Sequence, residues 1–155
     1  MDGMDKFKVD KLKYPIILKM VDDSRIKGDI FLDIYSPIHR GRDMVQELME
    51  SEKSFFSLIM REDNSVVFIN KVSVVKIILE ERDSLEDLTL GKQKPVKIVL
   101  VDGEILSGKI NLSIPGEKVR ISDSLNSTSK WLYLYRNDQD VILNTSHIIT
   151  VQPLP

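Results

Sequence analysis

Short apolar runs that are rich in β-branched residues alternate with polar turns along the chain. Residues 16–21 and 96–101 are two such runs, and each follows a Pro and ends at an Asp-Asp or Asp-Gly pair. This pattern is typical of β-strands bounded by tight turns. The pair Asp102-Gly103 is the stronger turn signal, because Gly tolerates the positive φ that a tight hairpin requires. The pattern therefore predicts a chain built mainly of short strands.

A pattern of Pro, Asp and Gly occurs twice with the same spacing. In each copy an Asp falls 7 residues after a Pro and a Gly falls 13 after it: Pro15, Asp22 and Gly28 in the first copy, and Pro95, Asp102 and Gly108 in the second. The ends match as well, since residues 66–77 resemble residues 141–151. A repeat of about 80 residues is too long for a solenoid unit and indicates a duplicated small domain.

Each copy is expected to contain a second strand, over 26–34 and 105–114, with the repeated Gly inside it. A Gly within a strand usually marks a bulge or a sharp bend, as at the corner of a small barrel. Further strands are predicted over 54–60 and 130–135. A single 3-10 turn after the Asn that both copies share would join the last two strands of each copy.

The middle of the repeat differs between the copies. The shared Asn falls 42 residues after the shared Gly in the first copy and 36 residues after it in the second. The longer copy contains the segment 41–51, which places Met44, Val45, Leu48 and Met49 on one helical face. A helix is therefore predicted there, whereas the second copy has room for one helical turn near 122–126.

Strand, turn, bent strand, helical loop, strand, turn, strand, 3-10 turn and strand is the order of elements in a five-stranded small barrel. The run from Val99 to Ile110, with its Asp-Gly pair and its Gly108, resembles the first motif of the Sm-like fold, which eukaryotic Sm proteins and bacterial Hfq share. Residues 144–151 resemble the second motif, with Asn-Thr in place of the usual Arg-Gly or Lys-His. The resemblance speaks to the fold more than to the function.

We therefore expect a mainly β chain of two tandem five-stranded small barrels of the Sm/SH3-like type, with short helical insertions. The first barrel would span 13–79, with its helical insert at about 41–51, and the second would span 94–154. Residues 80–93 would form an acidic linker between them. Strand edges of Sm-like folds pair between subunits into rings, so the resemblance also implies self-association.

The charge balance argues against a dedicated nucleic-acid binder. The formal net charge is -2, from 22 basic and 24 acidic side chains, and such binders usually carry a strong basic excess. In Sm proteins an Asp-x-x-Met/Leu-Asn run near the bent strand contacts RNA bases. The similar run 123–126 begins 15 residues after Gly108, later than that position.

Residues that carry catalytic chemistry are scarce. The chain has no Cys, which excludes disulfides and thiolate sites, and its only histidines are His39 and His147, too few for a spaced metal site. Gly-rich phosphate motifs and nucleophile elbows are missing. Arg40 and Arg42 are too close together for the Arg-x-x-x-Arg segment of a PilZ-type receptor. We expect no enzymatic activity, no cofactor and no metal.

Two groups of residues are candidates for binding. His39, Arg40 and Arg42 form a short basic loop, which is either a solvated connection or a contact for an anion or phosphate.

The second group is aromatic. Trp131, Tyr133 and Tyr135 alternate with two Leu along one predicted strand, and Phe55 corresponds to Trp131 in the other copy. Alternate side chains point to opposite faces of a strand. The aromatics therefore either line an exposed face with Arg120 or Arg136, suited to a protein interface or base stacking, or lie buried at the seam between the two barrels.

The function that this sequence favours is a non-enzymatic module for protein interaction or assembly, with a protein partner or self-association. A divergent Sm-like RNA-binding protein is the alternative, with RNA as a less favoured partner. The segment 141–151 is aliphatic without a protecting Pro until Pro153, so it is expected to be an open strand edge that a second chain covers. No apolar run approaches the ~18 residues of a membrane span, and no apolar leader is present, so a cytoplasmic location without a membrane partner is expected.

Overall fold

The computed structural model describes residues 11–33, 41–81, 92–112, 120–127 and 129–155. The first half of the chain contains β1 (Lys11–Met20), β2 (Arg25–Asp33), α1 (Gly41–Glu50), β3 (Phe55–Met60), β4 (Val66–Asn70), the 3-10 turn η2 (Lys71–Ser73) and β5 (Val74–Leu79). The second half contains β6 (Lys92–Leu100), β7 (Ile105–Leu112), α2 (Ile121–Leu125), β8 (Trp131–Leu134), β9 (Val141–Asn144), the 3-10 turn η4 (Thr145–His147) and β10 (Ile148–Pro153). The chain is thus mainly β, as the sequence predicted, and the helix expected at about 41–51 is α1.

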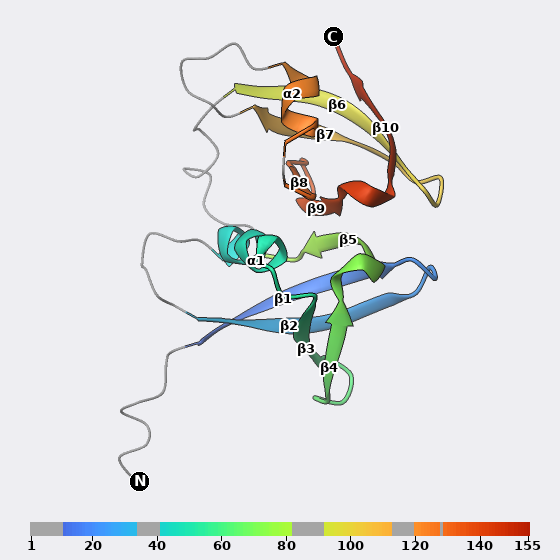
Figure 1. The fold of residues 1–155 in the computed structure, drawn as a ribbon. Coiled ribbons are helices and arrows are strands. Elements are labelled where there is room, and N and C mark those ends of the chain that lie inside the picture. The colour runs from blue at the N-terminus through green and yellow to red at the C-terminus, as the bar shows by residue number, and fades with distance from the viewer. Residues whose placement is uncertain (1–10, 34–40, 82–91, 113–119, 128) are drawn as a thin grey trace, which may run out of the picture.

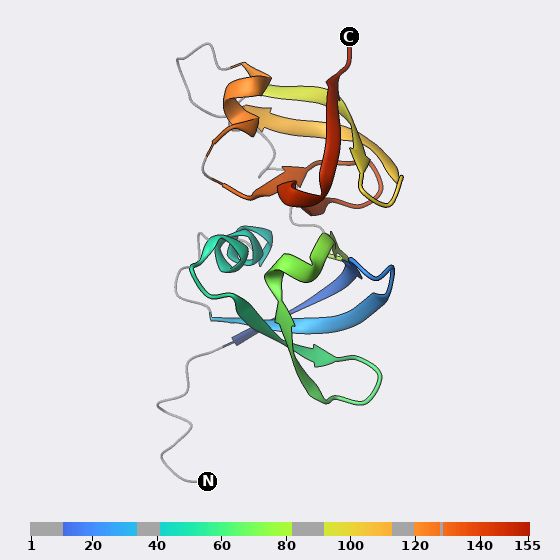
Figure 2. The same ribbon diagram turned by 45° about the vertical axis from the view of Figure 1, so that its right-hand side comes forward.

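The described strands form two antiparallel sheets. A seven-stranded sheet has the order β4-β3-β2-β1-β5-β9-β8, and a three-stranded sheet has the order β10-β6-β7. Figures 1 and 2 show the first half below and the second half above, with β5 and β9 where the halves meet. In both views β4 lies in the lower half and β10 in the upper half.

Equivalent residues of the two halves occupy equivalent positions. Gly28 lies opposite Ile16 in the β1–β2 pair, and Gly108 lies opposite Val96 in the β6–β7 pair. The last strand of each half also returns to the first strand with a register irregularity at the same place. The repeated spacing of Pro and Gly in the sequence therefore corresponds to a repeated strand register.

Both 3-10 turns are held by the Asn that the two copies share. The Asn70 Oδ1 accepts the Val72 backbone N–H at 3.3 Å, and the Asn144 Oδ1 accepts the Ser146 N–H at 3.0 Å. A side-chain amide two residues ahead satisfies a backbone donor that a short turn would leave unpaired. The predicted 3-10 turns between the last two strands of each copy are confirmed.

The predicted closed barrels are not found among the described strands. The main reason is that β5 of the first half pairs with β9 of the second, so that one sheet runs through both halves. In the second half, β7 and β8 meet only at the bridge between Lys109 and Tyr135, which leaves β8 and β9 in a different sheet from β6, β7 and β10.

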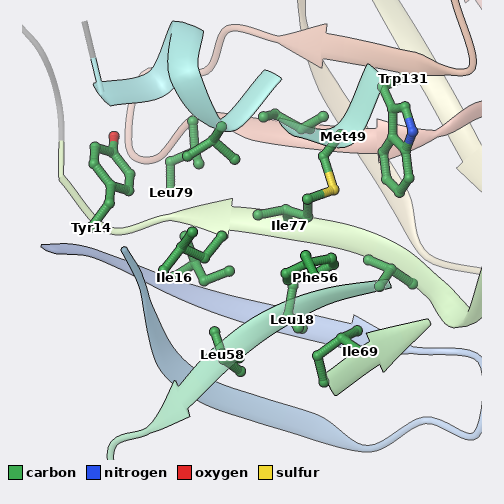
Figure 3. Packing of buried hydrophobic residues seen from close by; sticks show 14 of the residues in the cluster. Tyr14, Ile16, Leu18, Met49, Phe56, Leu58, Ile69, Ile77, Leu79 and Trp131 are labelled. Atoms are coloured by element: carbon green, nitrogen blue, oxygen red, sulfur yellow. The ribbon is translucent and has the colours of Figure 1, made fainter. Parts of the chain in front are cut away.

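Two hydrophobic clusters form the core, and each includes residues from both halves. The first is built mainly from the first half, but it includes Ile142 and Trp131, which Figure 3 shows beside Met49. The second is built mainly from the second half, but it includes Val75 and Ile78. Because β5 and β9 contribute to both clusters, they are buried on both faces, which explains why their sequences are mostly apolar rather than alternating, with Lys76 as the one charged residue.

The expectation that 141–151 is one open edge is wrong for its first part. β9 lies between β5 and β8 inside the seven-stranded sheet, and only β10 is an edge strand. The predicted linker 80–93 lies mostly outside the described residues; Glu80 at its start pairs with Arg61 at 2.9 Å, and Lys92 at its end already belongs to β6. Among the described helices, none is long and apolar enough to cross a membrane.

Candidate interaction site

The junction between the halves is the antiparallel pairing of β5 with β9. Ile77 lies opposite Ile142, and Ile78 lies opposite Val141. The Asn144 Nδ2 donates to the Val74 carbonyl oxygen at 3.1 Å in a fully buried hydrogen bond. The junction therefore resembles the interior of a sheet, with backbone pairing, apolar contacts and a satisfied amide.

Two ion pairs cross the same junction. The Lys76 Nζ lies 2.7 Å from the Glu104 Oε1, and the Lys19 Nζ lies 3.3 Å from the Asp102 Oδ2. The Asp102 carboxylate accepts the Glu104 backbone N–H at 2.9 Å, and this bond, with a smaller contribution from Lys19, holds the pKa of Asp102 below its usual value. Asp102 is therefore ionised at neutral pH and keeps the Lys19 pair.

The residues of the first half that correspond to buried junction residues are exposed. Phe55 lies opposite Asn70 as Trp131 lies opposite Asn144, and Phe68 precedes Asn70 by two residues as Ile142 precedes Asn144. The exposed fraction is 53% for Phe55 and 73% for Phe68, but 7% for Trp131 and 0% for Ile142. The same positions are thus covered in one half and open in the other.

Phe68 is in β4, the strand at one end of the seven-stranded sheet, and Phe55 is in β3, the strand beside it. Strand edges are usually protected by a charged residue or a Pro. β4 has the sequence Val-Val-Phe-Ile-Asn and carries neither. Val66 at its start and Val72 just beyond its end are exposed as well. We call this surface the β4 edge.

The second open edge is β10, which pairs with β6 alone among the described strands. Val151 corresponds to Ile77, because each lies opposite the residue three places after the repeated Pro. The register irregularity in each last strand leaves one residue without a position opposite it, Ile149 in β10 and Val75 in β5. Ile149 is 58% exposed, whereas Val75 is buried. We call this surface the β10 edge.

A hollow of about 590 Å³ lies beside the β10 edge. Its lining includes Ile121 and Leu125 of α2 and Val151 of β10. In the first half, the corresponding elements α1 and β5 supply Met49 and Ile77 to the cluster that takes up Trp131 (Figure 3). The hollow is therefore the place in the second half where the first half holds an aromatic side chain.

The predicted basic loop cannot be placed as a site. His39 and Arg40 lie outside the described residues. Arg42 belongs to the first turn of α1, and its side chain is also outside the described set.

The predicted aromatic face is not a single exposed surface in the structure. Trp131 packs in the first cluster, and Tyr133 packs against it while its hydroxyl donates to the Asp140 Oδ2 at 2.9 Å. The ring of Tyr135 lies 4.5 Å from that of Tyr133, centroid to centroid. Arg120 directly precedes α2 and lines the hollow beside the β10 edge, with its Nε 3.4 Å from the Asp123 Oδ2. Trp131 is therefore at the seam between the halves rather than on an outer face.

A second hollow, of about 500 Å³, is lined by both halves, among others by Lys53, Phe55 and Lys71 of the first half and by Lys130 of the second. The Lys71 Nζ is committed within the fold, since it donates to the Leu48 carbonyl at 2.6 Å and to the Ser51 carbonyl at 3.1 Å, where α1 ends. Burial, with a smaller contribution from the Lys53 charge, lowers the pKa of Lys71. Lys53 and Lys130 remain as the cations that face this hollow.

Within the part of the chain that the structure describes, no group of three or more His, Asp or Glu is placed to hold a metal ion. No family model matches this chain, and comparisons with curated proteins and with solved structures give no match either.

Sequence reasoning did not find Phe68 or Ile149 as candidate site residues. The signal was present in the repeat itself: aligning the shared Asn places Phe68 beside Ile142, and aligning the repeated Pro places Ile149 beside Val75. Without the β5–β9 pairing, nothing in the sequence says that Ile142 and Val75 are covered by the other half.

Proposed function

We propose that this chain is a non-enzymatic module for protein interaction and assembly, and that the open β4 and β10 edges bind another protein chain. The observation that carries this proposal is the exposure of Phe55, Phe68 and Ile149 at positions whose counterparts are buried at the junction. Monomeric soluble proteins rarely leave long apolar strand edges uncovered, because such edges pair with other chains.

The finer description of the fold belongs to the same proposal. Each half has the element order of a small Sm/SH3-like barrel, and each places its repeated Gly against the neighbouring strand. These features support two duplicated small barrels spanning about 13–79 and 94–154, related to the Sm-like family. A cytoplasmic location is likewise part of the proposal.

Light scattering coupled to size exclusion at micromolar concentration tests the proposed function. We expect a mass that is a multiple of the 17.8 kDa chain, stable over a tenfold dilution. Replacing Phe68 with Lys should lower the mass to one chain, because a charge at the pairing edge cannot be desolvated against a second strand. Phe31→Lys is the matched control, since Phe31 is a 47% exposed Phe of β2, a strand with neighbours on both sides.

A wild-type mass of one chain would leave the proposed function standing in one case only. In that case the wild-type chain and the Phe31→Lys variant bind a second protein of the native host, and the Phe68→Lys variant does not. The proposed function would be overturned if the wild-type chain has the mass of one chain and binds no protein in a way that depends on Phe68.

A divergent Sm-like RNA-binding protein is the second candidate, and the hollow that holds Lys53, Lys130 and the exposed Phe55 favours it. An aromatic face flanked by cations can stack a base and neutralise a phosphate. The near-neutral net charge argues against this role.

We expect no tight binding of single-stranded RNA at physiological salt. Fluorescence anisotropy with U-rich and A-rich oligomers measures it. RNA binding would become the first candidate if the affinity is sub-micromolar and falls with added salt. That affinity should also be lost in one of two double variants, Lys53→Ala with Lys130→Ala or Arg40→Ala with Arg42→Ala.

A further inference from the structure

The geometry points to a second copy of this chain as the occupant of both open edges. We propose that β10 of one copy pairs antiparallel with β4 of the next and repeats between chains the pairing that β5 and β9 make within one chain. This inference rests on the proposed function and names its partner.

The first support is that the junction uses one edge of each kind. It joins the fifth strand of the first half to the fourth strand of the second half. Of the other end strands of the two sheets, β7 and β8 meet each other at the Lys109–Tyr135 bridge, which leaves the fourth strand of the first half, β4, and the fifth strand of the second half, β10. A head-to-tail contact between copies would therefore join the same two kinds of edge as the junction does.

The junction also fixes the register between copies. Ile77 lies opposite Ile142, and Ile78 lies opposite Val141. The corresponding residues place Val151 of one copy opposite Phe68 of the next, and Gln152 opposite Val67. One hydrogen bond is not repeated: the Leu79 backbone N–H donates to the Asp140 carbonyl at 3.1 Å, and the residue that corresponds to Leu79 is Pro153, which has no N–H.

Shape and apolarity support the same arrangement. In this register Phe55 and Phe68 of the next copy face the hollow lined by Ile121, Leu125 and Val151. Trp131 and Ile142 occupy the equivalent place in the first half. The exposed Ile149 would be covered as its counterpart Val75 is covered at the junction.

The charges indicate how the contact between copies differs from the junction. Lys76 and Glu104 form an ion pair across the junction. Their counterparts are Thr150 and Ser24, which carry no charge. The contact between copies therefore depends on strand pairing and apolar burial, and added salt should not dissociate it.

A head-to-tail contact is heterologous, so the copies form a ring if the rotation between neighbours closes and a filament if it does not. In a ring the β4 edge and the β10 edge of every copy are paired, and each chain contributes two repeats. The ring would therefore contain an even number of repeats.

Disulfide cross-linking tests the register directly, because the chain has no Cys of its own. The variants Gln152→Cys and Val67→Cys leave Phe68 and Ile149 in place. Directly opposite residues of an antiparallel pair have Cβ atoms about 4.5–5.5 Å apart, close enough for a disulfide after small adjustment. We expect a 1:1 mixture of the two single variants to give a cross-linked dimer on a non-reducing gel, and the double variant to give a ladder of multiples of one chain.

The controls separate this contact from other ones. Each single variant alone should give no dimer, because a head-to-tail contact never brings two identical positions together. Gln152→Cys with Phe31→Cys reports random collision, since Phe31 is exposed on β2. The cross-links should form equally at low salt and at 1 M salt.

Dimers formed by Val67→Cys alone would overturn the inference in favour of a symmetric β4–β4 contact. An oligomeric mass without cross-links in the double variant would also overturn it, while the proposed function of assembly would stand. If the chain has the mass of one chain and binds a different protein through Phe68, the inference that a second copy is the occupant would be wrong, while the proposed function as an interaction module would stand. A single-chain mass without such a partner would remove both.

Discussion

Replacing Gly108 with Val is expected to lower the free energy of unfolding by about 3 kcal/mol, at the upper end of what overpacking usually costs. A Cβ at Gly108 would lie 2.5 Å from the Tyr135 carbonyl oxygen and 2.8 Å from the Leu134 Cγ. That oxygen accepts the Lys109 backbone N–H at 2.8 Å, and this bond is part of the bridge that joins β7 to the end of β8 among the described residues. It cannot withdraw without breaking the bridge, so the strain falls on the strand pair.

The midpoint of urea unfolding, measured at one fixed protein concentration, checks this effect. Ser107→Val is the matched control, because Ser107 precedes Gly108 in the same strand and is exposed; its effect should stay within about 0.5 kcal/mol. Gly28→Val should behave as Gly108→Val does, since its Cβ would lie 2.6 Å from the Ile59 carbonyl oxygen. An unchanged midpoint for either Gly variant would remove the argument that these Gly mark close strand contacts.

The repeat made much of the local structure predictable. The apolar runs after Pro15 and Pro95 indicated two strands that end before the Asp turns, and the apolar face of residues 44–49 indicated α1. The expected starts of these strands were wrong, because β1 and β6 begin at Lys11 and Lys92, before the two Pro. These features depend on residues close together in the sequence, where turn chemistry and helical periodicity decide the outcome. The repeated Gly was predicted at a strand bend, and it lies in a strand against a neighbouring backbone in both halves.

The way in which the halves join was not predictable from the same signals. The run Val141-Ile142-Leu143 was interpreted as an edge that a partner chain covers, whereas β9 is covered by β5 of the same chain. A continuous apolar run says that both faces of a strand are buried, but it does not say which strand lies beside it. That choice depends on a contact between residues more than 60 positions apart, such as Asn144 with Val74.

Trp131 and Phe55 provide the second large expected effect, because they are the same position of the repeat in two environments. Trp131→Ala should lower the free energy of unfolding by about 3–5 kcal/mol, the usual cost of removing a buried aromatic side chain. Its side chain fills the first cluster beside Met49 and Ile77 (Figure 3). Phe55→Ala should cost less than about 1 kcal/mol within a single chain, because half of the Phe55 side chain is already in water.

The assembly state should respond in the opposite order. If Phe55 of one copy faces the hollow beside β10 of the next, Phe55→Ala removes apolar area from the contact between copies and shifts the mass toward one chain at low concentration. Trp131→Ala acts inside one chain, so below its own unfolding midpoint it should retain the wild-type mass. Light scattering and urea unfolding on both variants measure the two effects separately. A Phe55→Ala variant that keeps the wild-type mass at every concentration would show that this Phe lies outside the contact. A Trp131→Ala variant as stable as Phe55→Ala would contradict the burial of Trp131 at the junction, and with it the pattern from which the contact between copies is inferred.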